Sequence, residues 1–389
     1  MKRFLKIGLA LGMLSSTLFA QETIRIGFLG TLSGANAAWG TSNVRSMETS
    51  AEIYNNQGGI EIDGKKYKIE IVPFDDAFDP KIAVAGMEKM AQEGIKYVVG
   101  PNDDAQAIAV KPIAERNKIV YFPYAFDKSL YVKPANYAVF GMIASYQWEP
   151  SVYKWLKDNK GIKSVAFIAA NAADPLNQRD NGIRIANDLG LDVVEAKATY
   201  KADTRDFFSV ITPIIKKKPD LLVLSGVSPA TAPLIIKTAR QLGFKGYMAA
   251  GTALDASILK EGAGDAANGF ICQGGADESI QSDKMKEWIA HYTKKYGEYN
   301  DESNTKVFAL EYILAVMKSN PKAINDADEF LKTADSDWSA PNLFFKDKEA
   351  KLKFVGKTTF GQNRQLGVPL TPKIYQNGEF KTLFVGQAD

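Results

Sequence analysis

Short apolar runs alternate with helical patterns along most of the chain, and this alternation limits the possible folds more than any other feature. Strands that alternate with helices favour parallel sheets with helices on both faces. The predicted strands cover residues 24–29, 67–73, 96–99, 119–122, 164–169, 191–199, 221–225 and 247–250. The predicted helices include a stripe through Val44, Met47, Ala51 and Tyr54 that stops at Gly58-Gly59, a helix opened by Pro80, and residues 176–189, 205–217 and 230–242.

The alternation restarts after about residue 144, which predicts two similar α/β lobes. Residues 280–335 then read as helical, and residues 351–389 return to strands with a tight hairpin turn at Gln376-Asn377-Gly378. Open parallel sheets bind ligands beyond the carboxyl ends of their strands. The sequence therefore predicts a ligand site between the two lobes.

The first 20 residues resemble a cleavable secretory signal, with Lys2, Arg3 and Lys6 before an apolar run and Ala20 at the end. Without them the 48 basic residues fall to 45, equal to the 45 acidic ones. A neutral mature chain lacks the charge of a nucleic-acid binder. No later apolar run approaches the roughly 18 residues of a membrane span. We expect an exported periplasmic protein without direct membrane insertion.

Cysteine and histidine are scarce, which limits both anchoring and catalysis. Cys272 is the single cysteine and lies far from the signal, so neither an intrachain disulfide nor an acylated N-terminal cysteine is expected. His291 is the single histidine, which removes multi-histidine metal sites and zincin motifs. It lies in a polar helical pattern that favours a structural role. We expect no metal, no cofactor and no catalytic residues.

Several motifs occur in the order and spacing of one family. They are Ile24-Arg25-Ile26-Gly27, Leu32-Ser33-Gly34, Trp39-Gly40, Asn55-Asn56-Gln57-Gly58-Gly59-Ile60, Asp75-Asp76-Ala77-Phe78-Asp79-Pro80, Gly100-Pro101, Gly264-Asp265-Ala266-Ala267-Asn268-Gly269 and Phe360-Gly361-Gln362-Asn363-Arg364-Gln365-Leu366. Together they resemble the branched-chain amino-acid-binding (Leu/Ile/Val-binding-like) proteins. These are periplasmic solute-binding proteins of ABC importers with the type I two-lobe α/β fold.

The resemblance implies a chain that crosses between the lobes near residues 143, 273 and 355, in a three-strand hinge. Lobe 1 is then expected to contain residues 21–143 and 274–354, and lobe 2 residues 144–273 and 355–389. The family closes around a small solute by hinge motion and presents it to an inner-membrane ABC permease. A monomer is the family expectation.

The resemblance also indicates which loops hold the ligand, and here the chain departs from the family. Two serines that hold a ligand carboxylate are replaced by Asp103 and Asp104, and Asn102 precedes them. Two like charges about 4 Å apart cost on the order of 4 kcal/mol near a protein surface. The alternative is that an aspartate only caps the following helix, and that Asn102 only satisfies the turn.

Aromatic side chains stand where the family often has small or hydroxyl residues. The loop after residue 122 contains Tyr124, Ala125 and Phe126, and Trp39 occupies the position of a family aromatic. An aromatic wall suits a flat ligand or a cation. The alternative is packing within the lobe.

In lobe 2 the acid that meets a ligand ammonium is missing, because Gly251-Thr252 follow that strand and Asp255 reads as a helix cap. Leu176, Ser228 and Thr252 are the lobe 2 contacts that we expect. The altered residues predict an aromatic or flat solute first, then an amide, polar alcohol or cation, and an ordinary branched-chain amino acid third. A ligand sensor for a signalling partner is the rival class, and an enzyme is disfavoured.

Overall fold

The computed structural model describes residues 21–34, 36–274, 280–297, 299, 308–347 and 351–387. The predicted signal at residues 1–20 lies outside the described residues. Among the helices in the described part of the chain, none combines the length and the apolar character that a membrane crossing requires.

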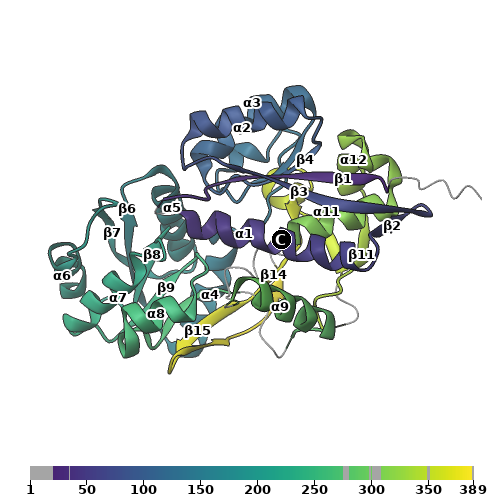
Figure 1. Cartoon of the computed structure of the whole chain (residues 1–389). Coiled ribbons are helices and arrows are strands. Elements are labelled where there is room, and N and C mark those ends of the chain that lie inside the picture. Colours follow the sequence, from purple (N-terminus) through teal and green to yellow (C-terminus); the bar gives the residue numbers. More distant parts are fainter. Residues whose placement is uncertain are drawn as a thin grey trace, which may run out of the picture.

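The first sheet has five strands in the order β2-β3-β1-β4-β5. Strands β1, β3, β4 and β5 run parallel, and β2 pairs antiparallel with β3. Their bounds are β1 (Thr23–Gly30), β2 (Ile60–Ile62), β3 (Lys65–Asp75), β4 (Tyr97–Val99) and β5 (Val120–Phe122). Figure 1 shows α2 and α3 on one side of this sheet and α1 with α11 on the other. We call this sheet and its helices the first lobe.

The helices of the first lobe follow the predicted signals. In α1 (Ala37–Asn56) the side chains of Val44, Met47 and Ala51 are buried, as their spacing predicts. In α2 (Pro80–Gln92) the N-cap Asp79 accepts a hydrogen bond from the Lys81 N–H at 2.7 Å. Helix α3 runs from Asp104 to Asn117.

The second sheet has seven strands in the order β16-β15-β10-β9-β8-β6-β7. The strands are β6 (Ser164–Ala170), β7 (Asp192–Tyr200), β8 (Leu221–Ser225), β9 (Tyr247–Ala250), β10 (Phe270–Gln273), β15 (Pro372–Gln376) and β16 (Glu379–Thr382). Its helices are α4 (Ser145–Lys160), α5 (Ala173–Asp188), α6 (Phe208–Lys216), α7 (Ala232–Gln241) and α8 (Ala256–Gly262). We call this sheet and its helices the second lobe.

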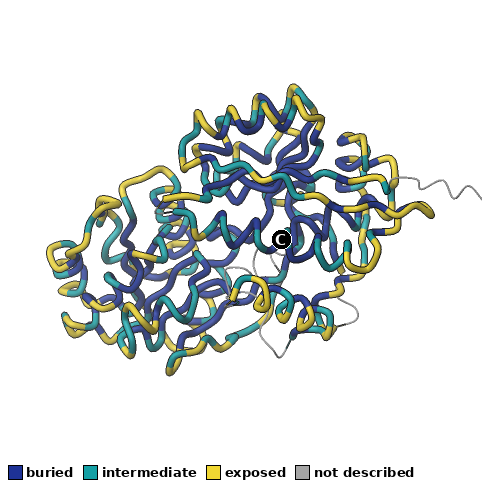
Figure 2. The backbone as a smooth tube through the Cα atoms, viewed as in Figure 1, coloured by how far each residue is buried: buried dark blue, intermediate teal, exposed yellow. Residues whose placement is uncertain are grey.

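Alternate residues of the second sheet pack into two different hydrophobic clusters. Leu222, Leu224 and Met248 join the cluster under α6 and α7, whereas Leu221 and Val223 join the cluster that continues into the first lobe. This is the period of two expected for strands covered on both faces. Figure 2 shows buried strands inside both lobes and exposed loops at their rims.

The predicted strands and helices are confirmed within a few residues, and so is the hairpin. Strands β15 and β16 pair so that Gln376 faces Glu379, with Asn377 at φ 54° and Gly378 at φ 92°. Those two positive φ angles define a two-residue turn of the type that asparagine and glycine favour. We did not predict β2, β10 and α4, of which β2 has three residues, β10 has four, and α4 has Pro150 inside it.

The C-terminal third of the chain returns to both lobes. Helices α9 (Asp283–Tyr296), α11 (Phe308–Ser319) and α12 (Ala327–Ala334) are followed by β11 (Ser339–Pro341), β12 (Lys351–Val355), α13 (Lys357–Phe360), β13 (Gln365–Leu366), β14 (Pro369–Leu370) and β17 (Gly386–Gln387). Phe140 forms a bridge with Gln365, and the Gly274 N–H donates to the Thr371 carbonyl at 3.0 Å. The predicted lobe boundaries stay a prediction.

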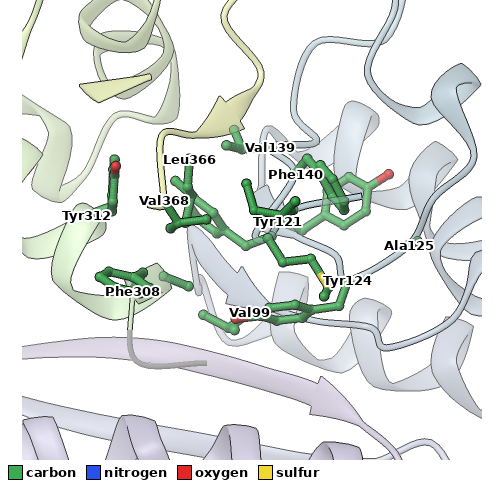
Figure 3. Packing of buried hydrophobic residues seen from close by; sticks show 14 of the residues in the cluster. Val99, Tyr121, Tyr124, Ala125, Val139, Phe140, Phe308, Tyr312, Leu366 and Val368 are labelled. Carbon is green, nitrogen blue, oxygen red and sulfur yellow. The ribbon is translucent and has the colours of Figure 1, made fainter. Parts of the chain in front are cut away.

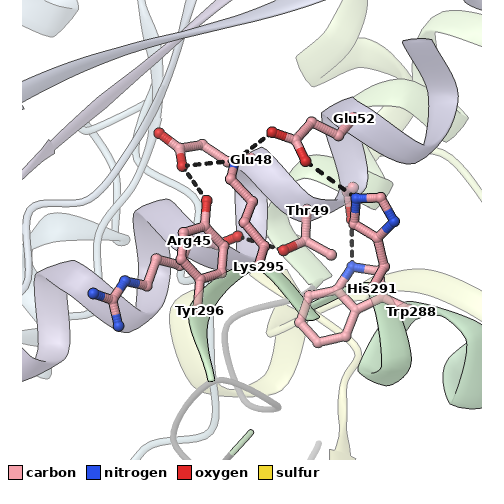
Figure 4. Close-up of polar contacts among 9 residues, drawn as sticks. Arg45, Glu48, Thr49, Glu52, Trp288, His291, Lys295 and Tyr296 are labelled. Atoms are coloured by element: carbon pink, nitrogen blue, oxygen red, sulfur yellow. Dashed lines mark hydrogen bonds and ion pairs between the residues drawn. The ribbon is translucent and has the colours of Figure 1, made fainter. Parts of the chain in front are cut away.

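The single histidine lies in the interface between α1 and α9. The Nε2 atom of His291 is 3.1 Å from Oε2 of Glu52, and Lys295 donates to the other oxygen of the same carboxylate, Oε1 (Figure 4). Trp288 donates to the Ser50 hydroxyl. Burial would raise the pKa of Glu52, but hydrogen bonds from Lys295 and His291 hold it below its usual value. The position fits the structural role predicted for His291.

Candidate ligand-binding site

All of the residues predicted for the site lie in loops or first helical turns that follow the carboxyl ends of strands. These are the edges where open parallel sheets bind ligands. The first lobe contributes Trp39 after β1, Asn102, Asp103 and Asp104 after β4, and Tyr124, Ala125 and Phe126 after β5, and the second lobe contributes Leu176 after β6, Ser228 after β8 and Thr252 after β9.

Asp103 is the N-cap of α3. Its backbone is extended, and its carboxylate accepts a hydrogen bond from the Ala105 N–H at 2.8 Å. Burial raises the pKa of this carboxyl, the Ala105 N–H lowers it, and the nearby Asp76 raises it further. The predicted cap is thus confirmed. A helix N-terminus attracts anions through its free N–H groups, and here the protein's own carboxylate lies at that place.

Asp104 ties α3 to the loop after β5. Only 4% of the residue is exposed, and Oδ1 accepts hydrogen bonds from the Phe126 N–H at 2.6 Å and the Asp127 N–H at 3.0 Å. The other oxygen, Oδ2, is buried and has no hydrogen-bond partner among the described residues. Burial raises the pKa of Asp104 to about 6, although the two N–H hydrogen bonds lower it. The charges of Asp103 and Asp127 raise it further.

Asn102 lies against the end of β1. A Cβ atom at Gly30 would be 2.5 Å from the Asn102 Oδ1 atom, so glycine is needed there for the side chain to take this position. Both polar atoms of the amide are buried without a hydrogen-bond partner in the described part of the chain. The amide therefore does not satisfy the turn through its side chain, and it retains one acceptor and two donor hydrogens.

The predicted aromatic residues divide into two groups. Tyr124 and Ala125 are 3% and 1% exposed and belong to the hydrophobic cluster, where Figure 3 shows Tyr124 next to Val99. Phe126 is half-buried and meets Phe140 edge-on, with 6.0 Å between the ring centroids. Trp39 is half-buried in the first turn of α1. The aromatic wall stays a prediction, and Trp39 and Phe126 are the members with surface left for a ligand.

The second-lobe residues that we predicted are half-buried. The Ser228 hydroxyl donates to the Thr231 hydroxyl at 2.9 Å, and its carbonyl accepts from the N–H groups that begin α7, so its polar groups stabilise that turn. Asp255 is the N-cap residue of α8, as its sequence position predicts. The roles of Leu176 and Thr252 in ligand binding stay predictions.

Asp174 is a site residue that the sequence did not lead us to select. It lies in the first turn of α5, where an acid is ordinarily explained by the helix dipole. Its Oδ2 accepts from Gln178 at 2.9 Å, whereas its Oδ1 is buried without a partner among the described residues. Burial raises its pKa well above the usual value, and the next largest causes are the charges of Asp104 and Asp103. A second-lobe carboxylate is therefore close enough to the first-lobe aspartates to feel their charges.

Tyr146, in the first turn of α4, is a second residue that we missed. It is 7% exposed, its hydroxyl has no partner within the described residues, and the Lys128 ammonium lies over its ring, 4.4 Å from the centroid. Burial raises the pKa of Tyr146, and the charges of Asp104 and Asp127 contribute. We did not select Tyr146 from the sequence because it follows the predicted crossing near residue 143, and no strand end directly precedes it.

The fold and these facing loops define the class: a protein with two α/β lobes whose polar groups meet at the strand ends between them. The family model described as "Periplasmic binding protein" matches residues 23–347, and the chain belongs to that family. The predicted family and the type I periplasmic binding protein fold are confirmed.

Curated relatives are similar over most of the chain. The Leu/Ile/Val-binding protein BraC3 of Rhizobium johnstonii is 26% identical over 350 residues, which cover 89% of this chain and 90% of that protein. The Leu/Ile/Val-binding protein of Escherichia coli K12 is 25% identical over 261 residues, covering 66% of this chain and 68% of that protein.

Solved structures share the fold. LivJ, the substrate-binding protein of a branched-chain amino acid transporter of Streptococcus pneumoniae, was solved with isoleucine and superposes with a TM-score of 0.76 at 20% identity, covering 94% of this chain and 99% of that one. A solute-binding protein of an ABC transporter from R. palustris, in complex with 4-hydroxybenzoate, has a TM-score of 0.77 at 18% identity, covering 94% and 98%.

Proposed function

We propose that this chain is the periplasmic substrate-binding component of an ABC importer and that its solute is not a plain branched-chain amino acid. The two lobes close around a small organic molecule and present it to an inner-membrane permease, and no bond is made or broken. Membership of the periplasmic binding protein family supports the transport role. The signal-like residues 1–20 support export.

One observation carries the ligand class: the Asp103 carboxylate occupies the N-terminus of α3. It accepts the Ala105 N–H at 2.8 Å, which is the kind of group that would otherwise bind a solute carboxylate. Asp104 follows it with two N–H groups already bound to Oδ1. A second carboxylate placed about 4 Å away would be disfavoured by roughly 4 kcal/mol at a partly screened site. The solute groups that suit these loops are flat or aromatic surfaces, amides, alcohols and cations.

Thermal unfolding of the refolded, ligand-stripped protein tests this proposal. The panel contains leucine, isoleucine, valine, aromatic acids, amides, polyols and amines. A solute at about 100 times its Kd adds roughly 2.7 kcal/mol to the folded state, which is a visible shift in Tm. We expect a shift from at least one of the other solutes and none from the branched-chain amino acids. A shift with leucine, isoleucine or valine would contradict the proposed ligand class.

The variant Asp103→Ser sharpens this test, because it removes the charge and leaves a hydroxyl that can still cap α3. We expect it to bind carboxylate-bearing solutes at least tenfold more tightly than the unmodified protein does. Asp79→Ser is the matched control: Asp79 caps α2 in the same way, with its carboxylate 2.7 Å from the Lys81 N–H. Equal carboxylate affinity in all three proteins would remove Asp103 from the site.

A further inference from the structure

We propose that the solute carries a positively charged nitrogen group, of the amine or amidine class, held between Asp104 of the first lobe and Asp174 of the second. This inference rests on the proposed function and makes Asp174 a specificity residue that the sequence alone did not indicate.

The acidic side chains around the proposed site carry negative charge that no ion pair with a described residue balances. The charges of Asp104 and Asp103 in the first lobe raise the pKa of Asp174 in the second, and within the first lobe Asp103 interacts in the same way with Asp76 and Asp104. Neutral groups donate the hydrogen bonds to these acids: the Thr31 hydroxyl and Phe78 N–H to Asp76, the Gln178 amide to Asp174, and backbone N–H groups to the other two. Within the described part of the chain, none of the four is in an ion pair. Asp76 and Asp104 are buried, and Asp103 and Asp174 are half-buried. Carboxylates withdrawn from water without a cation are costly, so their negative charge would favour a cationic solute.

Several polar atoms around the proposed site are buried without a hydrogen-bond partner, which is an observation separate from their charge. Oδ2 of Asp104, Oδ1 of Asp174, the Tyr146 hydroxyl and the Asn102 amide are all buried without partners among the described residues. Asp104 and Tyr146 are each more than nine-tenths buried. Both carboxylate oxygens can only accept while ionised, so a complementary group must donate hydrogen bonds. An ammonium or amidinium group donates several and neutralises charge, whereas a neutral amide or alcohol does only the former.

Lys128 and Arg184 are basic side chains that act on Tyr146 and Glu149 of α4, and both have partners of their own. The Lys128 ammonium lies over the Tyr146 ring, and burial and the Arg184 charge lower its pKa. Arg184 pairs with Asp188 on the same helix at 3.2 Å. The charge of the site is therefore left for the solute to balance.

The arrangement also links binding to closure. Asp104 and Asp174 belong to different lobes, so their like charges oppose the closed form when no cation lies between them. A cation that contacts both carboxylates binds the closed form better than any other form, and it shifts the population by that difference in affinity.

Isosteric probes of different charge test the proposal. Benzamidine, benzamide and benzoate share a flat ring and differ in charge, and agmatine adds an aliphatic cation. By titration calorimetry at pH 7.5 we expect at least one cation to bind ten times more tightly than benzamide, and benzoate to bind most weakly. Asp174→Asn and Asp104→Asn should each weaken that cation at least tenfold. Asp180→Asn is the matched control, because Asp180 is an exposed acid of the same helix α5 and its loss leaves the Arg184–Asp188 pair intact.

A second measurement needs no ligand. Burial of the Asp174 carboxyl costs stability at pH 7.5 whether it stays ionised or takes up a proton, so the Tm of ligand-free Asp174→Asn should exceed that of the unmodified protein, and Asp180→Asn should not raise it. An unchanged or lower Tm for Asp174→Asn would overturn the inference. Binding of neutral or anionic solutes without any cation would overturn it while leaving the proposed function intact. If no solute of any charge binds, both the inference and the proposed function fail.

Discussion

Asp104 stabilises the fold with one carboxylate oxygen and, under our proposal, meets the solute with the other. Its Oδ1 atom accepts hydrogen bonds from two N–H groups of the loop after β5. A serine hydroxyl at the same place carries no charge and would accept weaker hydrogen bonds. Its Oδ2 atom remains buried without a partner in the described structure. Asp103 is therefore the helix cap and Asp104 holds the loop with one oxygen, and a ligand contact by either residue stays a prediction.

Glu149 carries a prediction about pH. It lies in α4 with 1% exposure, and burial raises its pKa to about 8, although the Tyr153 hydroxyl and the charge of Arg184 act in the opposite direction. The unfolded chain releases this proton near its ordinary pKa of 4.5, so the folded state binds the proton more tightly. The contribution to stability is present below pH 4.5 and is lost as the pH rises to about 8.

We therefore expect the free energy of unfolding to decline between those pH values, and to decline less in Glu149→Gln, which cannot ionise. Urea denaturation at pH 5, 7 and 9 measures both curves. The two proteins share the titration of Asp104, so that contribution cancels in the comparison. Parallel curves for the two proteins would refute the assignment.

At the scale of elements, polar anchors hold the segment after α13 against the first lobe. The Arg364 side chain is 4% exposed, makes two contacts with Asp335 at 2.6 and 3.0 Å, and donates to the Asn136 carbonyl at 2.9 Å. Gln362 donates to the carbonyls of Tyr131 and Ala135. These bonds position β13 beside Phe140, where two passages of the chain lie side by side.

We expect Arg364→Met to reduce the free energy of unfolding by about 2–3 kcal/mol, because it removes a bidentate pair and leaves a backbone carbonyl unsatisfied. Arg116→Met is the control: it removes an exposed single contact with Glu88 and should cost less than about 1 kcal/mol. Denaturant unfolding of both variants gives the comparison. Equal losses would show that the segment is not anchored by Arg364.

At the scale of the whole molecule, the two lobes meet beside the proposed site, where Lys128 of the first lies over the Tyr146 ring of the second. The predicted hinge near residues 143, 273 and 355 would let the lobes move as rigid bodies. Solution scattering with and without a solute from the panel should therefore show a smaller radius of gyration in the bound protein. Identical profiles at saturating solute would contradict hinge closure.

Much of the fold could be predicted because burial periodicity is a local property. The spacing of Val44, Met47 and Ala51 predicts the buried face of α1, and the Asn377-Gly378 pair predicts the hairpin, since each follows from neighbours in the chain. Very short strands such as β2 were not predicted, because three residues contain too little periodicity to be distinguished from a loop.

The sequence by itself determined the alternation of strands and helices, the family, and the loops that we propose for the site. Only the tertiary structure decided that Tyr124 packs in the hydrophobic cluster and that the charge of Asp104 acts on Asp174. The physical reason is that a hydrogen bond left unmade, or a charge left unpaired, depends on which distant segments meet in space. No local pattern records those meetings, because the packing of one lobe against the other creates them.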